Sequence, residues 1–71
     1  MFSSEQDRFF SACYNAVKEI EFRAKQNDIP LNHASVIAQR EAISIVVSHM
    51  GYSLKDFLFW VLTNRSDENS G

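Results

Sequence analysis

Cysteine, proline and glycine are scarce in this 71-residue chain, which contains one, one and two of them. The single cysteine, Cys13, excludes a disulfide within one chain, and with it the usual staple of small secreted domains. So few prolines and glycines argue against an all-β fold, because such folds need many tight turns. The chain also lacks a glycine-rich loop that could hold a phosphate group. We therefore expect a helical protein of a reducing, cytoplasmic compartment.

Long apolar segments and an excess of positive charge are missing as well. The longest uninterrupted apolar run is FLFWVL, six residues at 57–62, whereas about 20 are needed to span a bilayer. The first ten residues lack a basic stretch followed by an apolar run, so the sequence predicts no signal peptide. Seven Lys and Arg against nine Asp and Glu give a net charge of −2. We expect no membrane association, and binding to nucleic acid through bulk positive charge is disfavoured.

Side chains that could carry out chemistry are few and poorly placed. Cys13 falls between Phe10 and Val17 on an apolar helical stripe, where a cysteine behaves as a small hydrophobe. His33 and His49 lie sixteen residues apart on one predicted helix. They cannot share a metal ion, and zinc needs three or four converging ligands. We expect no catalytic residue, no metal site and no cofactor, and hence no enzyme.

The apolar pattern predicts a single all-α domain at 1–65, with helices at about 4–27, 33–50 and 53–64. Hydrophobic residues make up 45% of the chain and aromatic residues 13%, which favours a packed core over disorder. The predicted connections are short, so that helices adjacent in the sequence should be neighbours in space. Residues 66–71 are polar, and we expect them to form a disordered tail.

Local signals mark the ends of these helices. Ser3 and Gln6 have the spacing of a capping box at the start of the first helix. Asn32 is the expected N-cap of the second helix, and Gly51 supplies the left-handed residue that ends it. Ser53 is the expected N-cap of the third helix.

The second predicted helix carries apolar side chains on two sides. One side holds Val36, Ile43, Val46, Val47 and Met50, and another holds Ala34, Ala38, Ala42 and Ile45. Small residues four positions apart allow another helix to approach closely. We therefore expect the second helix to be the central element, with neighbours on two sides.

The third predicted helix is apolar on nearly every side. At about 100° per residue, its stripe for the core consists of Leu54, Phe57, Leu58 and Val61. Phe59, Trp60 and Leu62 are left on the flanks. Either the helix lies in the groove between the other two, with Phe59 partly exposed, or another polypeptide buries these flanks. Because monomers seldom leave large contiguous apolar patches in water, we favour the second interpretation.

Phe22 indicates a possible second surface. It lies opposite the apolar stripe of the first helix, on a polar face that also carries Arg8 and Lys18. A single exposed aromatic residue needs no special explanation. An aromatic side chain within a polar rim, however, also has the anatomy of an interface anchor.

Two functions remain open. The favoured one is a small non-enzymatic regulator or adaptor that binds protein, as a homodimer, through Phe59, Trp60 and Leu62, with Phe22, Arg8 and Lys18 as the possible second surface. The alternative is a transcriptional regulator, because residues 43–60 fit a loose helix-turn-helix pattern with Gly51 in the turn. A recognition helix needs polar or basic side chains in the major groove, and Lys55 is the only basic residue within the predicted third helix.

Overall fold

The computed structural model describes residues 2–70, with side-chain surroundings for residues 2–64. It contains three helices, α1 (Ser4–Gln26), α2 (Ala34–His49) and α3 (Leu54–Ser70), and no strand within the described part of the chain. The predicted all-α fold is confirmed.

The capping box at the start of α1 is confirmed. The Ser3 hydroxyl accepts a hydrogen bond from the Gln6 amide at 3.1 Å, and the Gln6 side chain accepts one from the Ser3 amide at 3.0 Å. At the other end, Asp28 takes a left-handed conformation with φ of 56°. This turn lets the Ile29 amide donate to the Ala24 carbonyl at 2.8 Å, which satisfies a terminal carbonyl and reverses the chain.

The second helix begins one residue later than expected. His33, and not Asn32, is the N-cap, and its Nδ1 accepts a hydrogen bond from the Ser35 amide at 3.1 Å. A turn from Pro30, whose carbonyl accepts from the His33 amide, delays the helix. The predicted stop is confirmed, because Gly51 has φ of +87° and ends α2 in a Schellman motif.

The third helix is longer than expected. Ser53 precedes it, and its hydroxyl accepts from the Asp56 amide at 3.4 Å. The helical backbone continues to Ser70 and does not end near residue 64, since no proline or glycine interrupts the chain before Gly71. The predicted disordered tail at 66–71 concerns residues outside those whose side chains are described, and it stays a prediction.

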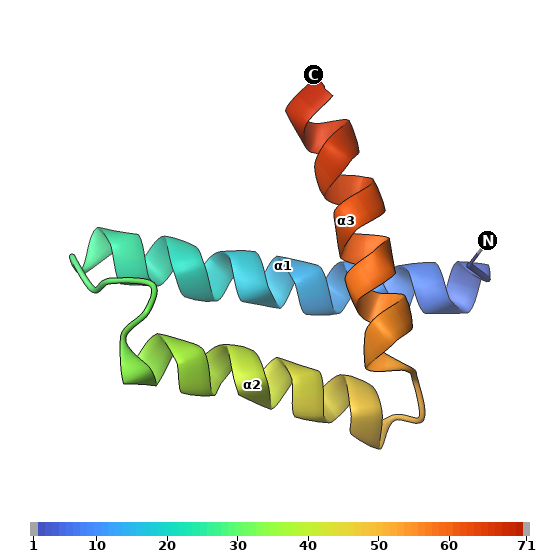
Figure 1. Cartoon of the computed structure of the whole chain (residues 1–71), viewed down its shortest axis with the longest axis horizontal. Helices are drawn as coiled ribbons and strands as arrows, with labels where there is room; N and C mark the ends of the chain where they lie inside the picture. Colours follow the sequence, from blue (N-terminus) through green and yellow to red (C-terminus); the bar gives the residue numbers. More distant parts are fainter. Residues whose placement is uncertain (1, 71) are drawn as a thin grey trace.

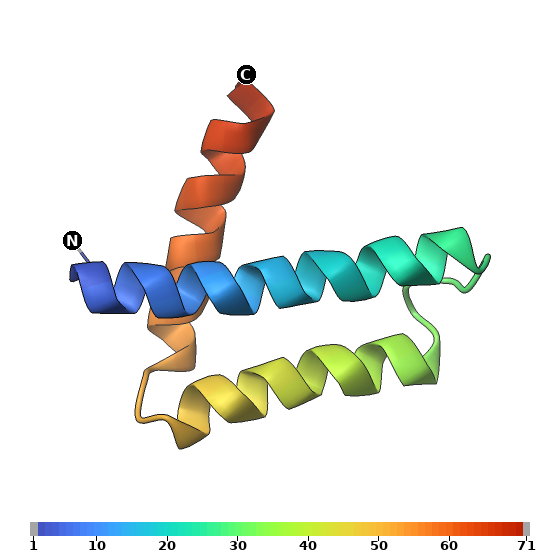
Figure 2. The same cartoon turned by 180° about the vertical axis from the view of Figure 1, so that it is seen from behind.

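The helices form a thin, open arrangement (Figure 1). α1 and α2 run antiparallel side by side, and α3 starts beside the end of α2 and crosses α1 steeply on one face, as the view from behind confirms (Figure 2). The chain measures 37 × 33 × 16 Å, and one helix with its side chains is already about 10–12 Å wide. α3 thus covers only part of one face of the α1–α2 pair.

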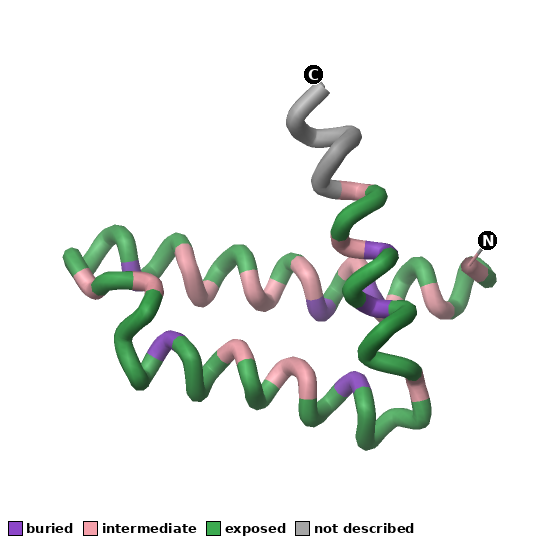
Figure 3. Tube along the Cα trace, in the orientation of Figure 1, coloured by how far each residue is buried: buried purple, intermediate pink, exposed green. Residues whose placement is uncertain are grey.

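The core lies where α3 crosses α1 beside the end of α2 (Figure 3). Its buried members are Phe10, Cys13, Val47, Phe57 and Trp60. Tyr52, from the connection between α2 and α3, stacks on Phe9 with ring centroids 4.6 Å apart and meets the edge of Phe10 at 5.5 Å. These aromatic contacts hold the start of α3 against α1.

The outer side of α2 is uncovered, so the expectation of a central α2 with neighbours on two sides is wrong. Ala34, Ala38 and Ala42 are exposed, and Ile45 is 66% exposed. The core-facing side of α2 is instead built on Val36 and Val47, which are 1% and 0% exposed.

Candidate interaction surface

The rotation of α3 about its axis is set by Trp60. This side chain is 4% exposed, and its indole Nε1–H donates a hydrogen bond to Oδ1 of Asp7 at 2.8 Å. Phe57 and Val61 turn to the core with it, and Asn64 donates to the Trp60 carbonyl at 2.9 Å. The expectation that Trp60 lies on an exposed flank is wrong. Its buried indole needs a polar partner, and Asp7 provides one.

This rotation leaves three large apolar side chains in water. Leu58, Phe59 and Leu62 are 61%, 64% and 64% exposed. The exposure predicted for Phe59 and Leu62 is confirmed, whereas Leu58 was expected in the core and is not there. Leu54, also expected in the core, is 40% exposed. Residues three and four apart adjoin on a helix, so Leu58, Phe59 and Leu62 form one continuous patch, here called the α3 ridge.

The α3 ridge has the composition of an interface centre. Lys55, one turn before Leu58 and Phe59, is the single charged residue on this side of the described part of α3. The Phe59 ring lies 6.1 Å from that of Phe2, which supports it from one side. Depletion of charge together with exposed aromatic and aliphatic side chains is typical of the buried centre of protein interfaces.

A hollow lies beside the ridge, between α3 and the facing sides of α1 and α2; it is called here the corner groove. It has a volume of about 540 Å³ and is lined by Tyr14, Val17, Lys18, Glu21, Lys25, Leu31, Arg40, Ser44, Phe57, Leu58 and Val61. Leu58 therefore belongs to both the ridge and the groove. The apolar lining is concentrated near α3, and most of the polar lining comes from α1 and α2.

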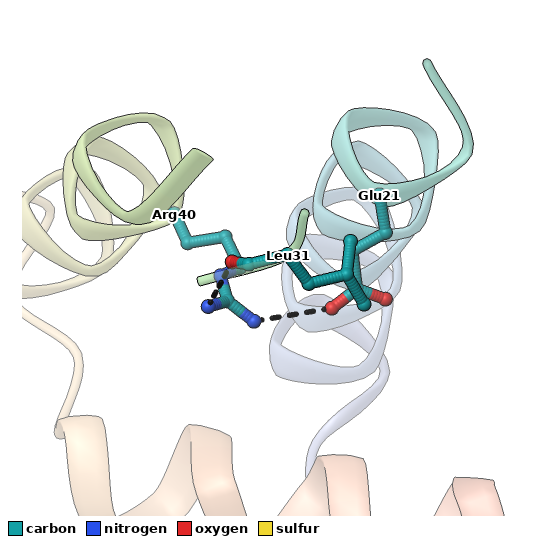
Figure 4. A network of polar contacts seen from close by, with 3 residues as sticks. All are labelled: Glu21, Leu31 and Arg40. Atoms are coloured by element: carbon teal, nitrogen blue, oxygen red, sulfur yellow. Dashed lines mark hydrogen bonds and ion pairs between the residues drawn. The ribbon is translucent and has the colours of Figure 1, made fainter. Parts of the chain in front are cut away.

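An ion pair lies along the polar part of the groove (Figure 4). Arg40 extends from α2 towards α1, where its Nη1 donates to Oε2 of Glu21 at 3.2 Å. Its Nη2 donates to the carbonyl of Leu31 at 3.3 Å. No local pattern in the sequence indicated this pair, because Arg40 and Glu21 are 19 residues apart.

The second predicted surface is divided by the structure. Phe22 is 60% exposed and shares a shallow depression with Lys18. The Nζ atom of Lys18 also lies 5.2 Å from the ring centroid of Tyr14, on the side of the corner groove. Arg8 is fourteen residues before Phe22 on the same helix, which is about 21 Å along the axis. Arg8 therefore does not form part of a rim around Phe22.

Comparison with known proteins does not assign a role to this surface. Family models, curated proteins and solved structures were compared with it, and none matches. The interpretation of the α3 ridge and the corner groove therefore rests on their exposure, shape and charge.

Groups with catalytic potential are sparse within the described part of the chain. No three His, Cys, Asp or Glu residues among the described ones converge as metal ligands. None of the helices in that part combines the length and hydropathy that crossing a bilayer requires. Cys13 is an unpaired thiol, 7% exposed within the core, as its place on the apolar stripe predicts.

The burial of Cys13 predicts a pH dependence of stability. Desolvation raises the pKa of its thiol above the ordinary value, so the unfolded chain loses this proton at a lower pH than the folded protein. The free energy of unfolding should therefore fall as the pH rises above about 8.5, by up to about 1.4 kcal/mol per pH unit for this group. Urea unfolding between pH 7 and pH 10 measures the effect.

The matched control for this prediction is Cys13→Ala, which lacks the thiol and keeps every other titrating group. Its unfolding free energy should be lower at neutral pH and should fall less steeply above pH 8.5. If the unfolding free energies of the two proteins instead fall in parallel above pH 8.5, folding does not raise the pKa of the Cys13 thiol, and the prediction is wrong.

Proposed function

We propose that this chain is a small non-enzymatic regulator or adaptor that binds protein through the α3 ridge and is itself a homodimer. The observation that carries the proposal is the exposure of Leu58, Phe59 and Leu62, each above 60%, on adjoining turns of one helix. Large contiguous apolar patches on otherwise folded proteins mark interaction sites. The reducing, cytoplasmic location expected from the sequence is part of this proposal.

The energy available from the ridge is substantial but limited. Fully burying one such side chain contributes about 1.5–3 kcal/mol, so burying the exposed part of three contributes about 3–6 kcal/mol per chain. Two chains contribute twice this amount, against about 4–15 kcal/mol for the freedom lost on association. The ridge alone supports a weak dimer, and neighbouring side chains must add to the contact.

The helix-turn-helix alternative has one observation in its favour. α2 and α3 lie at a steep angle to each other (Figure 1), and residues 50–53 join them, a short connection that contains Gly51. Among the residues whose side chains the structure describes, the exposed side of α3 nevertheless presents Leu58, Phe59 and Leu62, with Lys55 as the one cation beside them. Base edges are read by polar and basic side chains, so this surface suits an apolar protein partner better than a major groove.

The proposal predicts that the triple variant Leu58→Gln/Phe59→Gln/Leu62→Gln is a folded monomer. Glutamine keeps a good helix propensity, and the three replaced side chains lie outside the core cluster. Sedimentation equilibrium at tens of micromolar should give a dimer for the wild type and a monomer for the variant. The helical circular dichroism signal should be unchanged.

The matched control is Ile45→Gln, which removes an equally exposed side chain (66%) from the outer side of α2. It should leave the dimer intact. A wild type that sediments as a monomer up to about 1 mM, or that binds random duplex DNA at micromolar concentration with a steep negative dependence on salt, would contradict the proposal. The second result would favour the helix-turn-helix alternative.

A further inference from the structure

A two-fold dimer uses the same patch on both chains, so that patch must be complementary to itself. The face that carries α3 meets this condition, because it has a projection, the α3 ridge, next to a hollow, the corner groove. We infer that each chain of the homodimer inserts its α3 ridge into the corner groove of the other chain. This inference rests on the proposed function and names both the partner and the surface that receives the ridge.

The exposed area of the chain supports a partner of its own size. The surface accessible to solvent is 5362 Å², whereas a compact monomer of this mass exposes about 4,500 Å². The excess of about 860 Å² is comparable to the roughly 800 Å² that each partner contributes to a standard interface. An area of this size is what a second copy of the chain would cover in a standard interface.

The chemistry of the corner groove suits an apolar insert. Tyr14, Val17, Leu31 and Val61 line it and are each only half-buried, so they retain apolar surface for a contact. Its volume of about 540 Å³ lies in the range of ordinary ligand pockets, about 300–1,000 Å³, and is therefore large enough for the few side chains of the ridge.

The polar side of the groove does not oppose this contact. The Arg40 guanidinium already donates to the Glu21 carboxylate and to the Leu31 carbonyl (Figure 4). Covering these groups therefore leaves no charge without a partner, which is the costly event in a buried interface. Lys18 and Lys25, which also line the groove, have long side chains that can keep their ammonium groups in water above an apolar contact.

Reciprocal insertion makes a quantitative prediction that face-to-face pairing of two ridges does not. A ridge variant, Phe59→Gln/Leu62→Gln, keeps its groove, and a groove variant, Ser44→Arg, keeps its ridge. Each variant alone loses both ridge–groove contacts of the dimer, whereas an equimolar mixture regains one complete contact. If each homodimer is weakened 100-fold relative to the wild type, the mixed dimer should be weakened only about 10-fold. Native mass spectrometry and sedimentation velocity with one labelled chain measure the three dissociation constants.

Ser44 is suitable because it lines the groove from α2 and lies outside the core cluster. Ser44→Ala is the matched control, and it should dimerise as the wild type does. Circular dichroism and urea unfolding establish that each variant is folded. Leu31→Gln, on the connection between α1 and α2, serves as the groove variant if Ser44→Arg fails to fold.

The outcomes separate this inference from the proposed function. A dimer that is disrupted by the ridge variant and unaffected by the groove variant keeps the proposed function and overturns reciprocal insertion. A mixed dimer no tighter than the two variant homodimers also overturns it. A monomeric wild type overturns both. A mixed dimer about tenfold tighter than either variant homodimer supports the inference.

Discussion

Phe10→Ala is expected to leave the chain largely unfolded at 25 °C. Phe10 is 0% exposed, and its ring lies 5.4 Å from that of Phe57 and 6.4 Å from that of Trp60. Replacing a buried phenylalanine by alanine costs about 3–5 kcal/mol, because the cavity collapses only in part. A single core in a chain of about 70 residues rarely supplies more than about 3–5 kcal/mol of stability, so this loss removes most or all of it. Circular dichroism and urea unfolding measure the loss.

Phe22→Ala is the matched control, since Phe22 lies on the same helix and is 60% exposed. Its free energy of unfolding should change by no more than about 0.5 kcal/mol. Both variants are to be compared at one protein concentration, because dimerisation stabilises the folded chain by mass action. Equal urea midpoints for the two variants would show that the aromatic cluster around Phe10 is not the core.

The parts of the fold that the sequence predicted well depend on residues close together in the chain. The capping box joins Ser3 to Gln6, three positions on. The end of α2 depends on the positive φ that Gly51 adopts most readily. The prediction of Asn32 as N-cap was wrong although its cause is also local, because the His33 amide donates to the Pro30 carbonyl and this turn makes the helix begin one residue later.

The rotation of α3 could not be predicted in this way. Its apolar residues lie on nearly every side, so their periodicity does not indicate which side turns inward. The side of α3 that faces the core depends on a hydrogen bond from Trp60 to Asp7, 53 residues away in the sequence. Trp60 was therefore predicted on a flank and is buried, whereas Leu58 was predicted in the core and is exposed. The exposure of Phe59 and Leu62 was predicted correctly. The corner groove was missed for the same reason, because three separate segments line it.

Trp60→Ala is expected to abolish folding and association together, and this prediction tests the rotation of α3 directly. The indole is 4% exposed and meets the Tyr14 ring at 5.8 Å, so its removal should cost about 3–5 kcal/mol. The loss should be present even in dilute solution, below the dissociation constant of the wild-type dimer. Phe59→Ala, one position earlier, should keep the urea midpoint of the dilute monomer and weaken only the dimer.

Two measurements distinguish this expectation from a direct role of Trp60 in the interface. Trp60 is the only tryptophan, so its fluorescence should already have the short wavelength of a buried indole in the dilute monomer, and should shift little on association. A dilute Trp60→Ala monomer with the wild-type urea midpoint and no ability to dimerise would place the indole at the interface. In that case α3 would be rotated about its axis, Leu58 would face the core, and other residues than Leu58, Phe59 and Leu62 would form the exposed apolar patch. The buried indole and its bond to Asp7 therefore determine which side of α3 is available to a partner.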